Sequence, residues 1–122
     1  MRLHRVAAVL LLIIFVLVGV HAAVTVHALD HTLATVDALP TPEGEGARDA
    51  FEALREDYDA LERLLHLTVS HDDLSSVRTS LSDLDGAILA RDEVAFLQAK
   101  SRLQDALWHL RRLSVPGLYS IF

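Results

Sequence analysis

Apolar residues run from Val6 to Val26 without a single acidic residue, lysine or arginine, and this run is the strongest pattern in the chain. A helix needs about 20 apolar residues to cross a bilayer, so the run predicts a transmembrane helix. Apolar residues then continue at near-helical spacing, at Leu29, Leu33, Val36 and Leu39. We therefore predict a membrane anchor over residues 6–28 and a helical extension over residues 29–39.

Beyond the extension, the pattern changes twice. Residues 40–46 contain two prolines and two glycines, which end a helix and predict a linker. Three later runs of mostly apolar residues have the alternating three-and-four spacing of helices that pack on one another. The runs are Phe51, Leu54, Tyr58, Leu61, Leu65 and Thr68; Leu74, Val77, Leu81, Leu84 and Ile88; and Phe96, Ala99, Leu103, Ala106, Leu110 and Leu113. This predicts an all-α protein in which one transmembrane helix precedes a small antiparallel three-helix bundle over residues 47–113.

The junctions between these runs carry helix-capping residues. Ser70 is a good N-cap, and Asp73 three residues later completes a capping box. Asp92 is the N-cap expected for the third run. An alternative is a stutter within one long helix over residues 47–90, which gives a long helical hairpin that dimerises.

The charges around the apolar run predict its orientation. Arg2 and Arg5 precede the run, and no further basic residue follows until Arg48. The positive-inside rule then places residues 1–5 in the cytoplasm and the bundle outside the cell membrane. A cleaved signal peptide is the alternative, cut after Ala22 or Ala28. The run is longer than the usual 7–15-residue core of a signal peptide, which favours a retained anchor.

Charge and cysteine content exclude several classes of function. The chain has 11 basic residues, and without Arg2 and Arg5 nine remain against 17 acidic residues, a formal charge of −8 on the outer part. This argues against nucleic-acid binding and against peripheral attachment to anionic lipid. The chain has no cysteine, so disulfides, thiolate metal sites and thiol nucleophiles are excluded.

The last nine residues, 114–122, form an apolar C-terminal tail that departs from the helical pattern. Pro116 and Gly117 predict a turn. The apolar residues that follow predict packing against the end of the bundle, with a docking peptide as the alternative.

The outer part resembles a family of small bacterial proteins, domain of unknown function 4363, over most of residues 50–122. The resemblance lies in the His-x-acid-aliphatic element formed by His71, Asp73 and Leu74, and in the terminal Ile121-Phe122. It implies one N-terminal anchor and a small helical outer domain, chiefly in bacteria of the Gram-positive type. No activity is attached to the family.

The chain departs from that family at two places. Members carry tryptophans in the first outer helix, where this chain has Phe51 and Tyr58. Members often end in Asn-Ile-aliphatic, where this chain has Ser120.

Two groups of polar residues are candidates for a site. His71, Asp72 and Asp73 lie together at a helix junction, where they either brace the junction or bind a ligand. His27 and His31 are four residues apart at the outer membrane interface, a spacing that suits a metal ion but also suits simple interfacial side chains. No serine-nucleophile, phosphate-loop or other catalytic motif is present.

These patterns predict a non-enzymatic protein, integral to the cytoplasmic membrane, with no cofactor and no resident metal. Its outer domain is expected to act by contact with a protein partner, as an accessory, signalling or envelope component. The alternative is a small ligand- or metal-binding sensor centred on His71 and the neighbouring acids.

Overall fold

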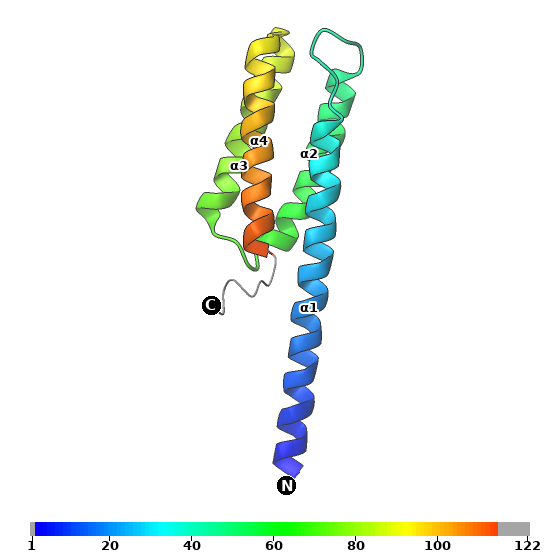
Figure 1. Cartoon of the computed structure of the whole chain (residues 1–122), viewed down its shortest axis with the longest axis vertical. Helices are drawn as coiled ribbons and strands as arrows, with labels where there is room; N and C mark the ends of the chain where they lie inside the picture. Colours follow the sequence, from blue (N-terminus) through cyan, green and yellow to red (C-terminus); the bar gives the residue numbers. More distant parts are fainter. Residues whose placement is uncertain (1, 115–122) are drawn as a thin grey trace.

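The computed structural model describes residues 2–114, and these form four helices and no strand. Helix α1 spans Arg2–Asp37, α2 spans Ala47–Leu65, α3 spans His71–Ala90 and α4 spans Glu93–Ser114. Consecutive helices run in opposite directions, and α1 is much the longest (Figure 1). The predicted all-α class is confirmed.

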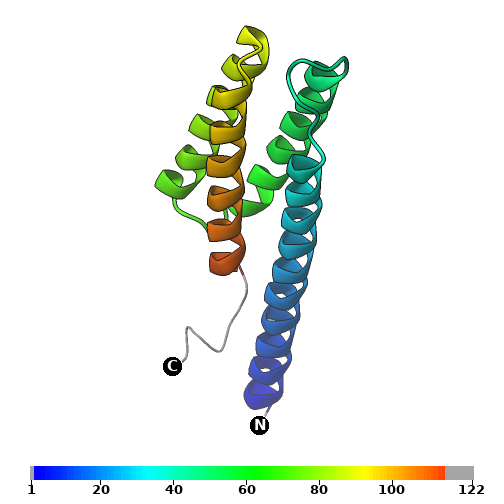
Figure 2. The ribbon, with the colours of Figure 1, turned by 45° about the horizontal axis from the view of Figure 1, so that its top comes forward.

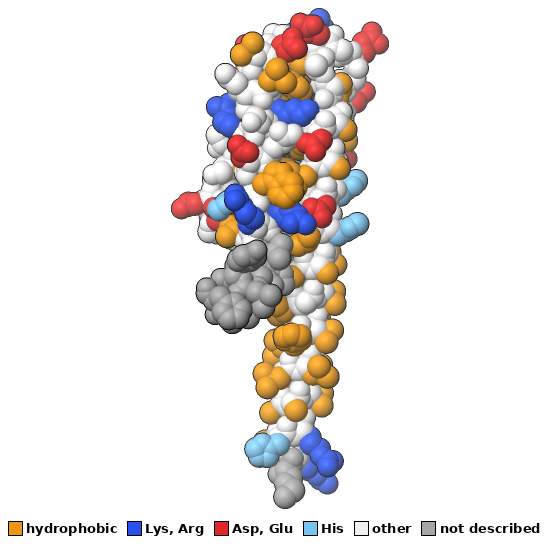
Figure 3. Space-filling model, viewed as in Figure 1, with side chains coloured by type: hydrophobic (Ala, Val, Ile, Leu, Met, Phe, Trp, Pro, Cys, Tyr) orange, Lys and Arg blue, Asp and Glu red, His pale blue; other side chains and the backbone are white. Residues whose placement is uncertain are grey.

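Helix α1 has two parts with different surroundings. Its N-terminal part projects alone from the other helices in both ribbon views (Figures 1 and 2). This part carries hydrophobic side chains along its length and basic side chains at its free end (Figure 3). The helix is long and apolar enough to cross a membrane, and none of its most apolar window is buried against the rest of the protein.

The C-terminal part of α1 is packed into the core. Its buried residues recur one helical turn apart and are Thr25, Leu29, Thr32, Leu33 and Val36. The hydroxyls of Thr25 and Thr32 donate to the carbonyl oxygens of His21 and Ala28, at 2.7 and 2.9 Å. These buried hydroxyls are therefore satisfied within the helix.

Four helices, rather than three, contribute to the hydrophobic core. Helix α1 contacts α2 and α4, and α3 also contacts α2 and α4, so the described helices pack in a ring. The three-helix bundle expected from residues 47–113 therefore needs a correction. The extension of α1 supplies the fourth helix, because Leu29, Leu33, Val36 and Leu39 join the same core cluster as the later helices.

The predicted seams match the core closely in α2 and α3. Thr68, the last residue of the first predicted seam, is an exception, because it lies in the turn after α2 and is exposed. In α4 the seam shifts near its end: Leu107 is buried, Ala106 is partly buried and Leu113 is 51% exposed. The predicted inward position of Leu113 is therefore wrong, because the buried side of α4 runs through Leu103, Leu107 and Leu110, and Leu113 lies off that side.

The helix ends follow the local sequence. The predicted linker, residues 40–46, is a loop, and Gly46 adopts a φ of 96° that favours glycine. Ser70 caps α3 by accepting from the Asp73 amide, and Asp92 caps α4 by accepting from the Ala95 amide at 3.1 Å. Residues 47–90 thus form two helices, and the single long helix is not observed. The expected packing of the tail concerns residues 115–122, which lie outside the described residues.

Candidate functional site

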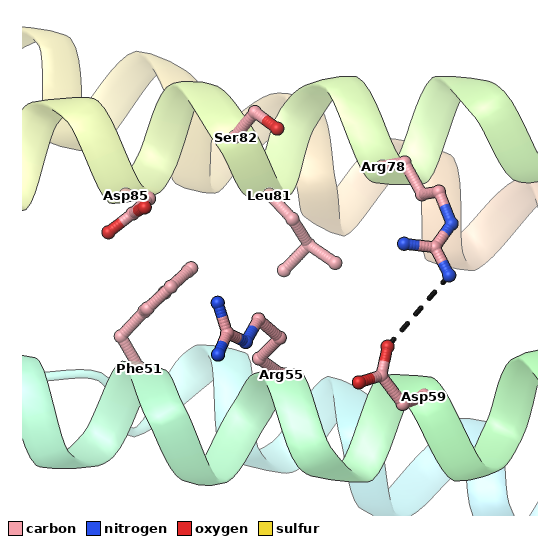
Figure 4. Close-up of a pocket in the computed structure, with 7 residues that line it drawn as sticks. All are labelled: Phe51, Arg55, Asp59, Arg78, Leu81, Ser82 and Asp85. Atoms are coloured by element: carbon pink, nitrogen blue, oxygen red, sulfur yellow. Dashed lines mark ion pairs between the residues drawn. The ribbon is translucent and has the colours of Figure 1, made fainter.

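A surface depression lies between α2 and α3, the neighbouring helices that approach each other least closely. It encloses about 270 Å³ and is lined by Phe51, Arg55, Asp59, Arg78, Leu81, Ser82 and Asp85 (Figure 4). We call this depression the α2–α3 groove. Its residues come from two helices only, so its width depends directly on how α2 and α3 pack.

The groove has an apolar floor and charged rims. Phe51 and Leu81 point into it from opposite helices, and both belong to the buried core (Figure 4). Arg55 and Asp59 rise on the α2 side, and an ion pair of 3.9 Å joins Asp59 to Arg78 across the groove. Charges of both signs therefore surround a small apolar surface.

An ion pair between an exposed arginine, Arg78, and a buried carboxylate, Glu62, lies at one end of the groove. The Glu62 side chain is 9% exposed, and the Arg78 Nε donates to its Oε1 at 3.0 Å. The Arg78 guanidinium also lies 5.9 Å from the centre of the Tyr58 ring, close enough for a cation–π contact. The hydrogen bond to Glu62 raises the pKa of Arg78.

The same ion pair connects the groove to a second, more polar hollow. This hollow is lined by Asp59, Glu62, Arg63, His66 and Arg78. The His66 Nε2 lies 3.5 Å from the Glu62 Oε1. The two hollows share Asp59 and Arg78, so polar groups continue along the α2–α3 boundary toward the turn between these helices.

The other end of the groove is held by Arg48. Its guanidinium is hydrogen-bonded to Asp85 of α3 and donates to Glu52 of α2 at 2.9 Å. It also lies 5.7 Å from the centre of the Phe51 ring. The bond to Asp85 raises the pKa of Arg48. Both ends of the groove are thus bridged by an arginine, and the stretch between them is open.

The structure places the predicted junction residues at the start of α3. His71 and Asp72 are exposed, and within residues 2–114 no side chain bonds to the His71 ring. Asp73 makes the junction contacts: it accepts from the Ser70 hydroxyl at 2.8 Å and lies 3.2 Å from the Nε2 of His109 in α4. His109, which sequence reasoning did not single out, therefore ties α4 to the start of α3.

The two histidines of α1 predicted as a possible metal site, His27 and His31, have separate environments. His31 pairs with Asp57 of α2 at 3.3 Å. His27 lines a shallow hollow beside Asp30 and Arg111, which form an ion pair of 2.7 Å. Among residues 2–114, no three His, Cys, Asp or Glu side chains are grouped so that they could hold a metal ion.

The α2–α3 groove was missed at the level of sequence, although a signal for it exists. Arg55, Arg78 and Asp85 are charged residues immediately beside seam positions of α2 and α3. Such flanking positions border the contact between packed helices. Which of these flanks stays open depends on how closely two helices approach, and spacing alone does not give that.

No protein-family model, curated protein or solved structure matches this chain. The resemblance to the domain of unknown function 4363 family stays a prediction.

Proposed function

We propose that this protein is a single-pass membrane protein whose helical domain lies outside the cytoplasm and acts by binding another protein. The observation that carries the proposal is the division of α1. Residues 2–20 are exposed and residues 6–20 have no polar side chain, whereas from Thr25 onward the same helix has a buried face. A helix that is hydrophobic on all sides needs an apolar environment, which a bilayer supplies.

The α2–α3 groove is the surface that we propose for the protein partner. The exposed fractions of the Arg55 and Asp59 side chains are 53% and 49%, so their charged ends are available at the rim. A partner segment with one apolar side chain, flanked by polar groups, fits above Phe51 and Leu81. Such a site binds through a small buried centre and a polar rim, the usual arrangement of protein interfaces.

The membrane part of the proposal is tested by topology. A reporter enzyme fused after Phe122 is expected to be active outside the cytoplasm, because Arg2 and Arg5 favour a cytoplasmic N-terminus. N-terminal sequencing of the mature protein is expected to begin at or next to Met1. A mature chain beginning near Ala23 or Leu29 would show that the apolar segment is a cleaved signal peptide.

The binding part is tested by site-specific photo-crosslinking in intact cells. A photoreactive residue replaces Ser82, which is exposed in the groove, or Ser101, which is exposed on α4. A discrete adduct is expected from position 82 and none from position 101.

A matched pair of charge reversals controls this experiment. Arg55→Glu changes the groove rim, whereas Arg102→Glu changes a comparably exposed arginine on α4. Arg55→Glu is expected to remove the adduct at position 82, and Arg102→Glu is expected to leave it. If the two variants give equal amounts of the adduct at position 82, the α2–α3 groove is not the binding surface.

A further inference from the structure

The turn between α2 and α3 leaves the bundle at the same end as the exposed half of α1 (Figures 1 and 2). The His21 Nε2 lies 3.1 Å from the carbonyl oxygen of Leu64, in the last turn of α2. This contact places the end of α2 beside residue 21 of α1. The α2–α3 turn, residues 66–70, therefore begins where the free apolar helix ends.

The free part of α1 is too short to hold the bundle away from a bilayer. Residues 6–20 lie between Arg5 and His21, and these 15 residues span about 22 Å at 1.5 Å per residue. The count from Arg2 adds residues 3–5 and gives about 27 Å. The hydrocarbon core is about 30 Å thick. A short span draws the bilayer surface inward toward its flanks, which brings lipid to the base of the bundle.

The helix also has no flexible stalk at this point. Helix α1 is continuous from Arg2 to Asp37, so residues 18–25 cannot extend to lift the bundle. The position of the α2–α3 turn relative to the bilayer is therefore set by the helix itself.

The α2–α3 turn carries the side chains that suit such a position. Leu67 is 77% exposed, one of the most exposed large apolar side chains outside the free part of α1. Arg63 and His66, within one turn of it, are exposed and polar. An apolar side chain beside long polar ones is the pattern of a segment that enters the headgroup layer.

We propose that the α2–α3 turn rests in the headgroup layer of the outer leaflet, with Leu67 inserted toward the acyl chains. The bundle then sits on the bilayer, and the opposite end, at the α3–α4 turn, faces away from it. This inference rests on the proposed membrane tether.

The test uses the full chain in two kinds of phosphatidylcholine vesicle, whose acyl chains carry bromine either near the headgroup or near the chain end. Each position of bromine quenches tryptophan at its own depth. The single tryptophan is first removed as Trp108→Phe. A new tryptophan is then introduced by Leu67→Trp at the turn, by Leu89→Trp at the opposite end of the bundle, or by Ile13→Trp in the apolar helix. Leu89 is a matched control because it is 69% exposed.

Fluorescence of the Leu67→Trp variant is expected to fall about twofold or more with bromine near the headgroup, since interfacial segments reach about 5–10 Å into this layer. Fluorescence of the Ile13→Trp variant is expected to fall similarly with bromine near the chain end, because residue 13 lies midway along the apolar span. Fluorescence of the Leu89→Trp variant is expected to stay unchanged. If only the Ile13→Trp variant is quenched, the proposed membrane tether is supported, and the proposed position of the α2–α3 turn in the headgroup layer is wrong. If the Ile13→Trp variant is not quenched, the proposed tether itself fails.

Discussion

The two halves of α1 belong to one helix and are both rich in apolar residues, yet they meet different surroundings. Leu11 in the free half is 68% exposed, whereas Leu29 in the bundle half is fully buried. In the free half, apolar side chains point in all directions. In the bundle half, they alternate with exposed polar residues such as Asp30 and Asp37. The difference teaches that the distribution of apolar residues around a helix indicates its surroundings. A uniform distribution needs an apolar environment on every side, whereas a one-sided distribution needs one packed face.

The largest expected effect comes from the same substitution made in each half. Leu29→Ala leaves a cavity in the core and is expected to lower the free energy of unfolding by about 2–5 kcal/mol. Leu11→Ala leaves the bundle untouched and is expected to change it by less than about 0.5 kcal/mol. Urea unfolding of the full chain in mild detergent, followed by Trp108 fluorescence, measures both. Equal losses would mean that the two halves do not differ in their packing.

The second comparison places a charge in each half. Ile13→Arg is expected to weaken membrane insertion by about 2.5–3.5 kcal/mol, the cost of an arginine at the centre of a membrane helix. Ala34→Arg lies on the exposed side of the bundle half and is expected to leave insertion unchanged. The membrane insertion of each variant is measured as the fraction of protein that resists alkaline extraction from membranes. Full resistance of the Ile13→Arg variant would argue against a membrane-spanning role for this half.

A third prediction concerns pH and the bundle alone. Burial raises the pKa of Tyr58 well above its usual value, so the folded state retains this proton at pH values where the unfolded chain has lost it. The contribution of Tyr58 to the free energy of unfolding is therefore fully present below the ordinary tyrosine pKa of about 10. Above that pH it decreases, by at most about 1.4 kcal/mol per pH unit.

Unfolding measured from pH 8 to 11 tests this dependence. Tyr58→Phe is expected to be less sensitive to alkaline pH than the parent, because the titrating group is gone. The Tyr58 hydroxyl lies 3.4 Å from the Leu74 carbonyl oxygen, so the variant loses one long hydrogen bond at neutral pH. An alkaline loss of stability equal to that of the parent would assign the effect to another group.

The smallest expected effects test whether the residues at the start of α3 only support the fold or also bind a ligand. Ser70→Ala removes the N-cap and is expected to cost about 1 kcal/mol. His71→Asn alters an exposed ring and is expected to change stability by less than about 0.5 kcal/mol. Calorimetric titration with zinc or copper is expected to show no tight binding to either variant or to the parent. A stoichiometric complex that His71→Asn abolishes would favour the sensor alternative.

Much of the helical organisation follows from local pattern. The seam residues of α2 and α3 that lie within these helices are buried, because a three-and-four spacing lines up one side of a helix. Ser70 and Asp92 were predictable as caps, because their side chains satisfy free amides in the first turn. These features depend on residues within a few positions of one another.

The candidate site was less predictable, because it depends on contacts between distant residues. His71 drew attention through its position at a junction, yet the junction contact joins Asp73 to His109, 36 residues apart. The α2–α3 groove needs Phe51 of α2 and Leu81 of α3 to line one depression while the charged residues beside them stay exposed at its rim. Local spacing gives the faces of the helices but not the distance between them.

The sequence by itself determined the apolar span, the helical class and the breaks around residues 40–46 and 91–92, since each depends on nearest neighbours along the chain. It left the break between α2 and α3 open, because a stutter within one long helix fits the same spacing. Only the tertiary structure decided that the second half of α1 is the fourth helix of the core. The periodic Leu29, Leu33 and Val36 are compatible with several partners, and the choice depends on the faces that α2 and α4 leave uncovered. Packing also decided where the free half of α1 ends, because the His21–Leu64 contact fixes the end of α2 against α1.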